Sequence, residues 1–198
     1  EVRTQVDAYL DDYQFAKANE LLYHFTWDEL CDWYIEISKV ALNGDDEELK
    51  ARKQENLIWI LDQILRLLHP IMPFVTEKLW LSMPHEGKSV MVAEYPTTHK
   101  EFENKQADQD MAFLIETIKA VRNIRMEVNA PMSSQIDIMI QLDDEANKRV
   151  LDENADYVEN FLHPKELTVA SEVEAPKLAK TAVIPGAQIF VPLTELVN

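Results

Sequence analysis

The chain is poor in glycine and cysteine, and this scarcity narrows the folds and sites that it can form. It has three glycines against nine prolines in 198 residues. A many-turned all-β fold is disfavoured by so little glycine, and a glycine-rich phosphate loop cannot be assembled. Cys31 is the single cysteine, which excludes an internal disulfide, and one cysteine with five scattered histidines gives no zinc-type spacing. We therefore expect long helices and a chain suited to a reducing cytosol.

Positive charge and long hydrophobic runs are also scarce. The chain has 19 Lys and Arg against 36 Asp and Glu, a formal net charge of −17. This balance argues against non-specific nucleic-acid binding, because phosphate contacts require clustered Lys and Arg. The most apolar stretch, residues 57–75, is interrupted by polar and charged side chains, and the polar start does not resemble a signal peptide. We expect a soluble, cytoplasmic chain without a membrane partner, and the 46% apolar content is enough to bury a core.

The first half reads as successive helices. Residues 15–42 contain neither Pro nor Gly, and apolar residues recur there at intervals of three and four, which predicts one helix with one buried face. That stripe consists of Tyr23, Trp27, Leu30, Tyr34, Ile37 and Ala41. Asp45 and Glu48 resemble a capping box that opens a second helix running to His69, which we expect to be central in the unit. A shorter helix is predicted from Phe74 to Met83.

The second half changes character after a polar linker at residues 97–106. We predict a helix over 108–128, a strand over 135–142, a helical stretch over 145–162, and short strands over 166–170, 181–184 and 188–192. Pro185-Gly186 indicates a hairpin turn between the last two strands. The predicted fold class is mainly α: a helical bundle over residues 1–96, followed by a helix and a small α+β subdomain over residues 97–198.

Three carboxylates on one predicted helix could suggest a metal or acid–base site. Asp28, Asp32 and Glu36 lie at i, i+4 and i+8. Such sites in helical bundles usually add a Glu-x-x-His pair on a facing helix, and the sequence contains no Glu-x-x-His. We favour a solvated acidic face, supported by pairing of Glu36 with Lys39, and expect no metal site.

One basic cluster lies on the helix predicted over 108–128. Lys119, Arg122 and Arg125 recur at intervals of three, and Asn123 adds an amide that could bond to a base or a sugar. Two interpretations remain equally open. The cluster contacts RNA, or its arginines cover the junction between the two subdomains and pair with carboxylates.

Aromatic side chains offer a second possible means of contact with unpaired bases. Their helical spacing favours packing in the core instead. This group consists of Trp27, Trp33, Tyr34, Trp59 and Trp80. Tyr13 and Phe15, near the start of a helix, are better placed to be exposed.

Several longer motifs resemble one family. The string Leu22-Tyr-His-Phe-Thr-Trp-Asp-Glu-Leu-Cys-Asp-Trp-Tyr-Ile-Glu36, with Lys39 after it, is similar to the signature of the anticodon-binding helical domain of bacterial-type, class I valyl-tRNA synthetases. Isoleucyl and leucyl enzymes share the bundle but not the Cys-Asp-Trp-Tyr string. The resemblance continues through Leu65 to Trp80, Val90 to Pro96 and Ala120 to Asn129 with Pro131, so that it covers nearly the whole chain.

The resemblance implies a part of an ATP-dependent enzyme, used with Mg, that ligates valine to tRNA(Val) and edits mischarged threonyl-tRNA. The family signatures His-Ile-Gly-His and Lys-Met-Ser-Lys-Ser do not occur here. The resemblance therefore implies a non-catalytic anticodon-binding region with no cofactor of its own, whose partners are tRNA(Val) and upstream catalytic and editing domains of the same chain, in a monomer. It also implies that the first bundle helix is incomplete and that a basic coiled-coil arm would follow residue 198.

The expected contacts with the anticodon stem and loop are chosen for their chemistry. They are Lys39, Lys119, Arg122, Asn123 and Arg125. A different class of function remains open, an acidic helical module that binds proteins and no RNA. A metal-dependent hydrolase using the three carboxylates is a third alternative.

Overall fold

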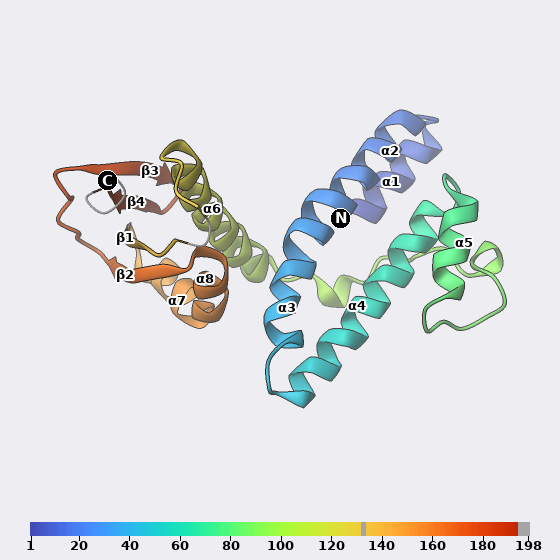
Figure 1. Cartoon of the computed structure of the whole chain (residues 1–198). Coiled ribbons are helices and arrows are strands. Elements are labelled where there is room, and N and C mark those ends of the chain that lie inside the picture. Colours follow the sequence, from blue (N-terminus) through green and yellow to red (C-terminus); the bar gives the residue numbers. More distant parts are fainter. Residues whose placement is uncertain (132–133, 194–198) are drawn as a thin grey trace. The chain divides into compact units, whose positions relative to one another are not determined.

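The chain forms two compact units. The computed structural model describes residues 1–131 and 134–193 (Figure 1). Contacts divide the chain into Glu1–Phe102, which we call the helical unit, and Glu103–Asn198, which we call the α+β unit. The division lies a few residues beyond the predicted one at 96/97. The chain end at which the basic arm is expected to follow, residues 194–198, lies outside the described residues.

The predicted fold class is confirmed: helices dominate, and a small sheet follows them. The helical unit contains α1 (Val2–Asp11), α2 (Phe15–His24), the π-helix η1 (Phe25–Ile35), α3 (Glu36–Leu42), α4 (Glu47–Leu68), α5 (Pro73–Leu81) and the 3-10 turns η2 (Val90–Val92) and η3 (Lys100–Phe102). None of the described helices is both long and apolar enough to cross a membrane.

The helix predicted over residues 15–42 is continuous but not uniform. Phe25 and Glu36, at its two junctions, keep helical backbone angles, while the segment between them is a π-helix. A π turn holds more residues than an α turn, so a 3.6-residue stripe drifts around the axis. The C-terminal part of the stripe is buried, but Tyr23 and Trp27 are 61% and 57% exposed. The prediction of one buried face is therefore wrong for these two aromatic residues.

The long helix α4 begins one residue later than its predicted cap. The side chain of Asp46, not Asp45, accepts a hydrogen bond from the Leu49 backbone N–H at 2.9 Å. Glu47 and Glu48 occupy the first turn, where carboxylates interact favourably with the helix dipole. Pro70 follows the helix end, and Pro73 opens α5 at a position where proline lacks no needed hydrogen bond.

Two small clusters make up the core of the helical unit. Val6, Leu22 and Leu67 join α1 and α2 to α4, and a second cluster joins Leu65 of α4 to Trp80. Both clusters use the C-terminal half of α4. Its N-terminal half carries three partly exposed apolar side chains, Ile58, Trp59 and Leu61. The expectation of a central helix thus holds for one half of α4 only.

The α+β unit packs helices against a four-stranded sheet. It contains α6 (Lys105–Glu127), β1 (Ile136–Leu142), α7 (Glu145–Glu153), α8 (Ala155–Leu162), β2 (Pro164–Ala170), β3 (Ala179–Ile184) and β4 (Ala187–Pro192). The strand order is β2-β1-β4-β3, with β1 and β2 parallel and the other pairs antiparallel. Side chains of β1 alternate between buried and half-buried, so one face of this strand lies in the core.

Two sequence predictions for this unit can be compared with the structure directly. The hairpin at Pro185-Gly186 is confirmed, and Gly186 adopts φ +86°, a conformation that other residues rarely adopt. The helical stretch predicted over 145–162 is two helices, because Asn154 leaves helical geometry. Its side-chain amide donates instead to the Val150 carbonyl at 2.8 Å.

Candidate nucleic-acid interface

Helix α6 positions the basic cluster. The side chain of Asn104 caps its first turn by accepting a hydrogen bond from the Ala107 backbone N–H at 3.1 Å. The helix packs against β3, β4, α7 and α8 of the same unit. Its inner face is apolar and buried, and includes Leu114, Ile118 and Val121. Residues at other positions around this helix therefore differ sharply in their access to a ligand.

Lys119 and Asn123 lie one turn apart on the outer face of α6. The Lys119 side chain is about half exposed, and its ammonium group lies 3.6 Å from a carboxylate oxygen of Glu116. The Asn123 side chain is exposed, and it forms no hydrogen bond within the part of the chain that the structure describes. These two side chains could contact a phosphate and a sugar or base edge together.

Arg122 lies at the edge of this outer face. Its guanidinium group stacks over the ring of Phe161 on α8, 5.0 Å from the ring centroid. This arrangement is typical of a cation–π contact. Its Nε is buried and has no hydrogen-bond partner among the described residues. Arg122 is therefore held partly by its own unit, and only the outer part of its guanidinium group is suited to a ligand.

Arg125 is a structural anchor, and the prediction that it contacts tRNA is not supported by its position. The residue is 1% exposed. Its guanidinium group donates to the carbonyls of Pro131 (3.0 Å), Ser134 (2.8 Å) and Leu162. Burial lowers the pKa of this guanidinium from its usual value. The alternative that the arginines pair with carboxylates does not describe Arg125 either, because its partners are carbonyl oxygens.

Helix geometry explains why the basic cluster separates. Successive residues of an α-helix are rotated by about 100°, so six residues advance the side chain by about 240° beyond a full turn. Lys119 and Arg125 therefore point to different faces of α6, although each is three residues from Arg122. The regular spacing of three was a poor guide over more than one interval.

Lys39 belongs to the helical unit. It lies on α3, is half exposed, and its ammonium group is 2.5 Å from a carboxylate oxygen of Glu36. This is the pairing that the sequence predicted. The lysine thus remains accessible, but a phosphate would have to compete with Glu36 for it.

The acidic trio does not gather into a site. Asp28 accepts or shares a proton with His24 Nδ1 at 2.8 Å, and Glu36 is paired with Lys39. Within residues 1–131 and 134–193, no group of three His, Cys, Asp or Glu side chains could hold a metal ion. Each of the two outer carboxylates therefore has a local partner on its own helix.

The exposed aromatic residues differ in part from those that the spacing predicts. Trp80 is fully buried, and its indole N–H donates to Asp62 at 2.6 Å. Trp27 and Trp59 are exposed, so the expectation of core packing is wrong for them. Tyr13 and Phe15 are exposed as expected, with their rings edge to face at 6.1 Å.

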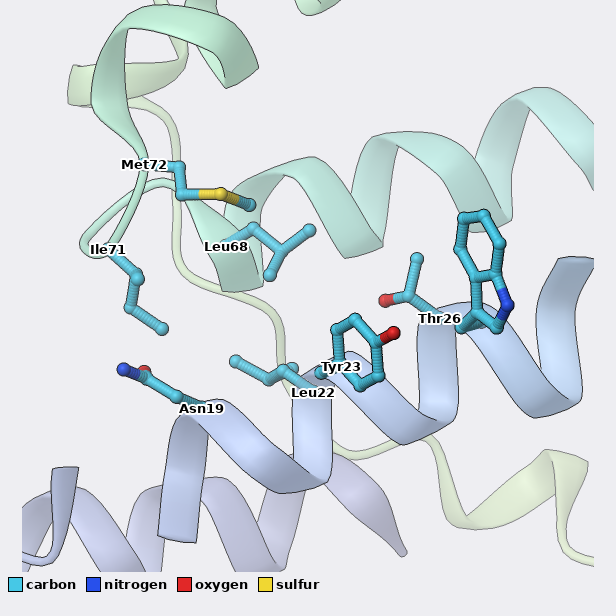
Figure 2. A pocket seen from close by; sticks show the side chains of 8 residues that line it. Asn19, Leu22, Tyr23, Thr26, Leu68, Ile71 and Met72 are labelled. Atoms are coloured by element: carbon cyan, nitrogen blue, oxygen red, sulfur yellow. The ribbon is translucent and has the colours of Figure 1, made fainter. Parts of the chain in front are cut away.

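An apolar pocket of about 300 Å³ lies between the α2–η1 helix and the end of α4 (Figure 2). It is lined by Asn19, Leu22, Tyr23, Thr26, Trp27, Leu68, Ile71 and Met72. None of the five expected tRNA contacts lines it. Sequence periodicity missed the pocket because it assigned Tyr23 and Trp27 to the core, and exposure of this face depends on what covers it.

The fold and its exposed surfaces can now be compared with known proteins. A family model described as the anticodon-binding domain of tRNA ligase matches residues 1–140. The chain therefore belongs to the family of anticodon-binding domains of tRNA ligases.

Among named proteins, the chain is similar to bacterial valine–tRNA ligases. It is 80% identical to the valine–tRNA ligase of Lactobacillus johnsonii over 98% of this chain, and 79% identical to that of Lactobacillus acidophilus over 98% of this chain. The valine–tRNA ligase of Enterococcus faecalis is 48% identical over the whole chain. In each case the chain spans only 22% of the relative's length.

Proposed function

We propose that this chain is the tRNA-recognition region of a valine–tRNA ligase and that it binds the anticodon stem and loop of tRNA(Val). The observation that carries the proposal is the 80% identity to a valine–tRNA ligase over 98% of the chain. The family match over residues 1–140 supports the same function.

The activity of the whole polypeptide follows from this assignment. It would attach valine to tRNA(Val) with ATP and Mg, as a monomer in the cytoplasm, and its catalytic and editing domains would lie in the part that the relatives have beyond these 198 residues. The role of this chain would be to hold the anticodon end of the tRNA. It would require no cofactor for that role.

The strong negative charge shapes how the chain could bind RNA. A net charge of −17 opposes a broad phosphate contact, so recognition must depend on a few well-placed side chains and on positive charge elsewhere in the polypeptide. Lys119 and Asn123 share an exposed face, Arg122 borders it, and Lys39 is accessible on α3. Arg125 would act indirectly, by fixing the C-terminal part of α6.

Two alanine variants of the whole polypeptide test the contacts. Lys39→Ala and Lys119→Ala each remove one exposed cation that is paired with a carboxylate three residues earlier. We expect each to weaken tRNA(Val) binding about fivefold, on the order of 1 kcal/mol, and to lower the salt dependence by roughly one counterion. Fluorescence anisotropy at several salt concentrations measures both quantities. Valyl-adenylate formation, which does not need the tRNA, should stay unchanged.

Lys50→Ala provides a matched control. Lys50 also pairs with a carboxylate three residues earlier, Glu47, at 2.9 Å. It lies in the first turn of α4 and is not among the expected contacts. If all three variants bind tRNA(Val) like the unaltered protein, the assigned contacts are wrong.

A further inference from the structure

The apolar pocket is part of a longer open surface, which we call the α2–α4 groove and define by the eight residues that line the pocket. Leu22 and Leu68 form its floor, and Tyr23 and Trp27 form one wall (Figure 2). Both wall residues are more than half exposed. An apolar surface of this kind on a protein is usually an interaction site.

Apolar exposure continues beyond the pocket along α4. Leu61 lies seven residues before Leu68 and therefore on the same face of the helix. It is 41% exposed, and Ile58, one turn earlier, is exposed as well. The exposed stripe thus extends over several helical turns, which suits an elongated apolar partner better than a single small ring.

One polar group in the groove lacks a partner. The Thr26 hydroxyl oxygen is buried and forms no hydrogen bond within the described residues. Figure 2 shows it on the side of η1 that borders the pocket. A buried hydroxyl without a partner costs free energy, so an occupant that supplies a hydrogen bond there would remove the penalty.

Charge around the groove distinguishes between kinds of occupant. The helix that forms the wall, residues 15–35, carries one lysine, Lys17. Its carboxylates are Glu20, Asp28, Glu29 and Asp32. A nucleic acid would bring phosphates close to these carboxylates, which is unfavourable. A protein segment with basic residues beside its apolar stripe would complement them.

We propose that the α2–α4 groove holds an α-helix with an apolar stripe and basic flanks, supplied by the part of the polypeptide outside these 198 residues. The proposal rests on the proposed function, because the relatives named as valine–tRNA ligases are several times longer than this chain. Two helices that diverge from a common end leave a channel into which a third helix packs at about 8–10 Å. The third helix completes the bundle and buries Tyr23 and Trp27.

Site-specific photo-crosslinking in the whole polypeptide tests this proposal. Trp27 is replaced by p-benzoylphenylalanine, and Met91, another exposed apolar residue of the same unit, is replaced in a control. After irradiation without tRNA, we expect the probe at Trp27 to crosslink within one polypeptide to a helical segment rich in Lys or Arg, outside the sequence studied here. A crosslink to residues 103–198, to a second copy, to added tRNA only, or none above the control would overturn the proposal.

A charge substitution provides a second measurement. Trp27→Glu places a carboxylate on a side chain that is exposed in this chain. We expect the melting temperature to be nearly unchanged in the 198-residue chain and to fall by several degrees in the whole polypeptide. Equal shifts in both would contradict an occupied groove. Because tRNA(Val) binding is measured on the same proteins, loss of the groove assignment with intact tRNA binding would leave the proposed function standing.

Discussion

The two units bury their apolar side chains to very different degrees. In the described part of the chain, all but three of the large apolar side chains that remain exposed belong to the helical unit, and the exceptions are Met126, Leu178 and Val183. The α+β unit closes a sheet face with helices, whereas the helical unit has two separate small clusters. A unit with its core closed can be stable alone, while a unit with open apolar faces needs other surfaces to cover them.

This difference indicates a division of labour. The α+β unit has internal reasons for its conformation, among them a buried arginine and a tight hairpin. The helical unit takes part of its stabilisation from whatever covers the α2–α4 groove. Variants that act only within one unit can break or sharpen this comparison.

The largest effect is expected from Arg125→Ala in the α+β unit. The substitution leaves the carbonyls of Pro131, Ser134 and Leu162 without their donor and opens a cavity. We expect a loss of about 3 kcal/mol in the free energy of unfolding, measured by urea denaturation of this chain. Lys119→Ala on the same helix is the control and should change stability by less than about 0.5 kcal/mol. A loss of tRNA affinity by Arg125→Ala at unchanged stability would show that the anchor role is wrong.

A somewhat smaller effect is expected at the β3–β4 hairpin. Gly186→Ala forces a side chain into φ +86° and places its Cβ 2.2 Å from the Asn147 side-chain nitrogen. That nitrogen donates to the Gly186 carbonyl at 3.2 Å, so the bond must move. Together these changes should cost about 2 kcal/mol. Gly44→Ala, at a position without positive φ, is the matched control, and equal destabilisation by the two variants in urea would contradict the account.

The smallest effect is expected in the helical unit. Trp80→Phe removes the indole N–H that donates to Asp62, while Asp62 keeps its ion pair with Arg66 at 2.9 Å. We expect a loss of about 1 kcal/mol in the free energy of unfolding. Trp59→Phe, at an exposed tryptophan, should have almost no effect. Thermal unfolding followed by circular dichroism compares them, and a larger loss for Trp59→Phe would show that the assignment of the core is wrong.

Local patterns in the sequence predicted most of the elements. The strand over Ile136–Leu142 and the Pro185-Gly186 hairpin follow from alternation and turn chemistry, which act over a few residues. The accessible lysines, Lys39 and Lys119, also follow from their polar helix faces.

Other features depend on contacts that the sequence pattern does not contain. The burial of Arg125 requires carbonyls from two distant segments to converge on it. The exposure of Tyr23 and Trp27 depends on which surfaces cover the groove, and their apolar spacing is the same whether or not a partner is present. Periodicity indicates which face of a helix is apolar, but not what lies against it.

The central claim, that this chain reads the anticodon end of tRNA(Val), is tested most directly by crosslinking from the RNA. A photoreactive nucleotide is placed in the anticodon loop of tRNA(Val), the complex with the whole polypeptide is irradiated, and the crosslinked peptides are sequenced. The account predicts crosslinks within these 198 residues, and a marked loss of crosslinking on competition with unlabelled tRNA(Val) but not with a tRNA of altered anticodon. Crosslinks that map only to other parts of the polypeptide would contradict it.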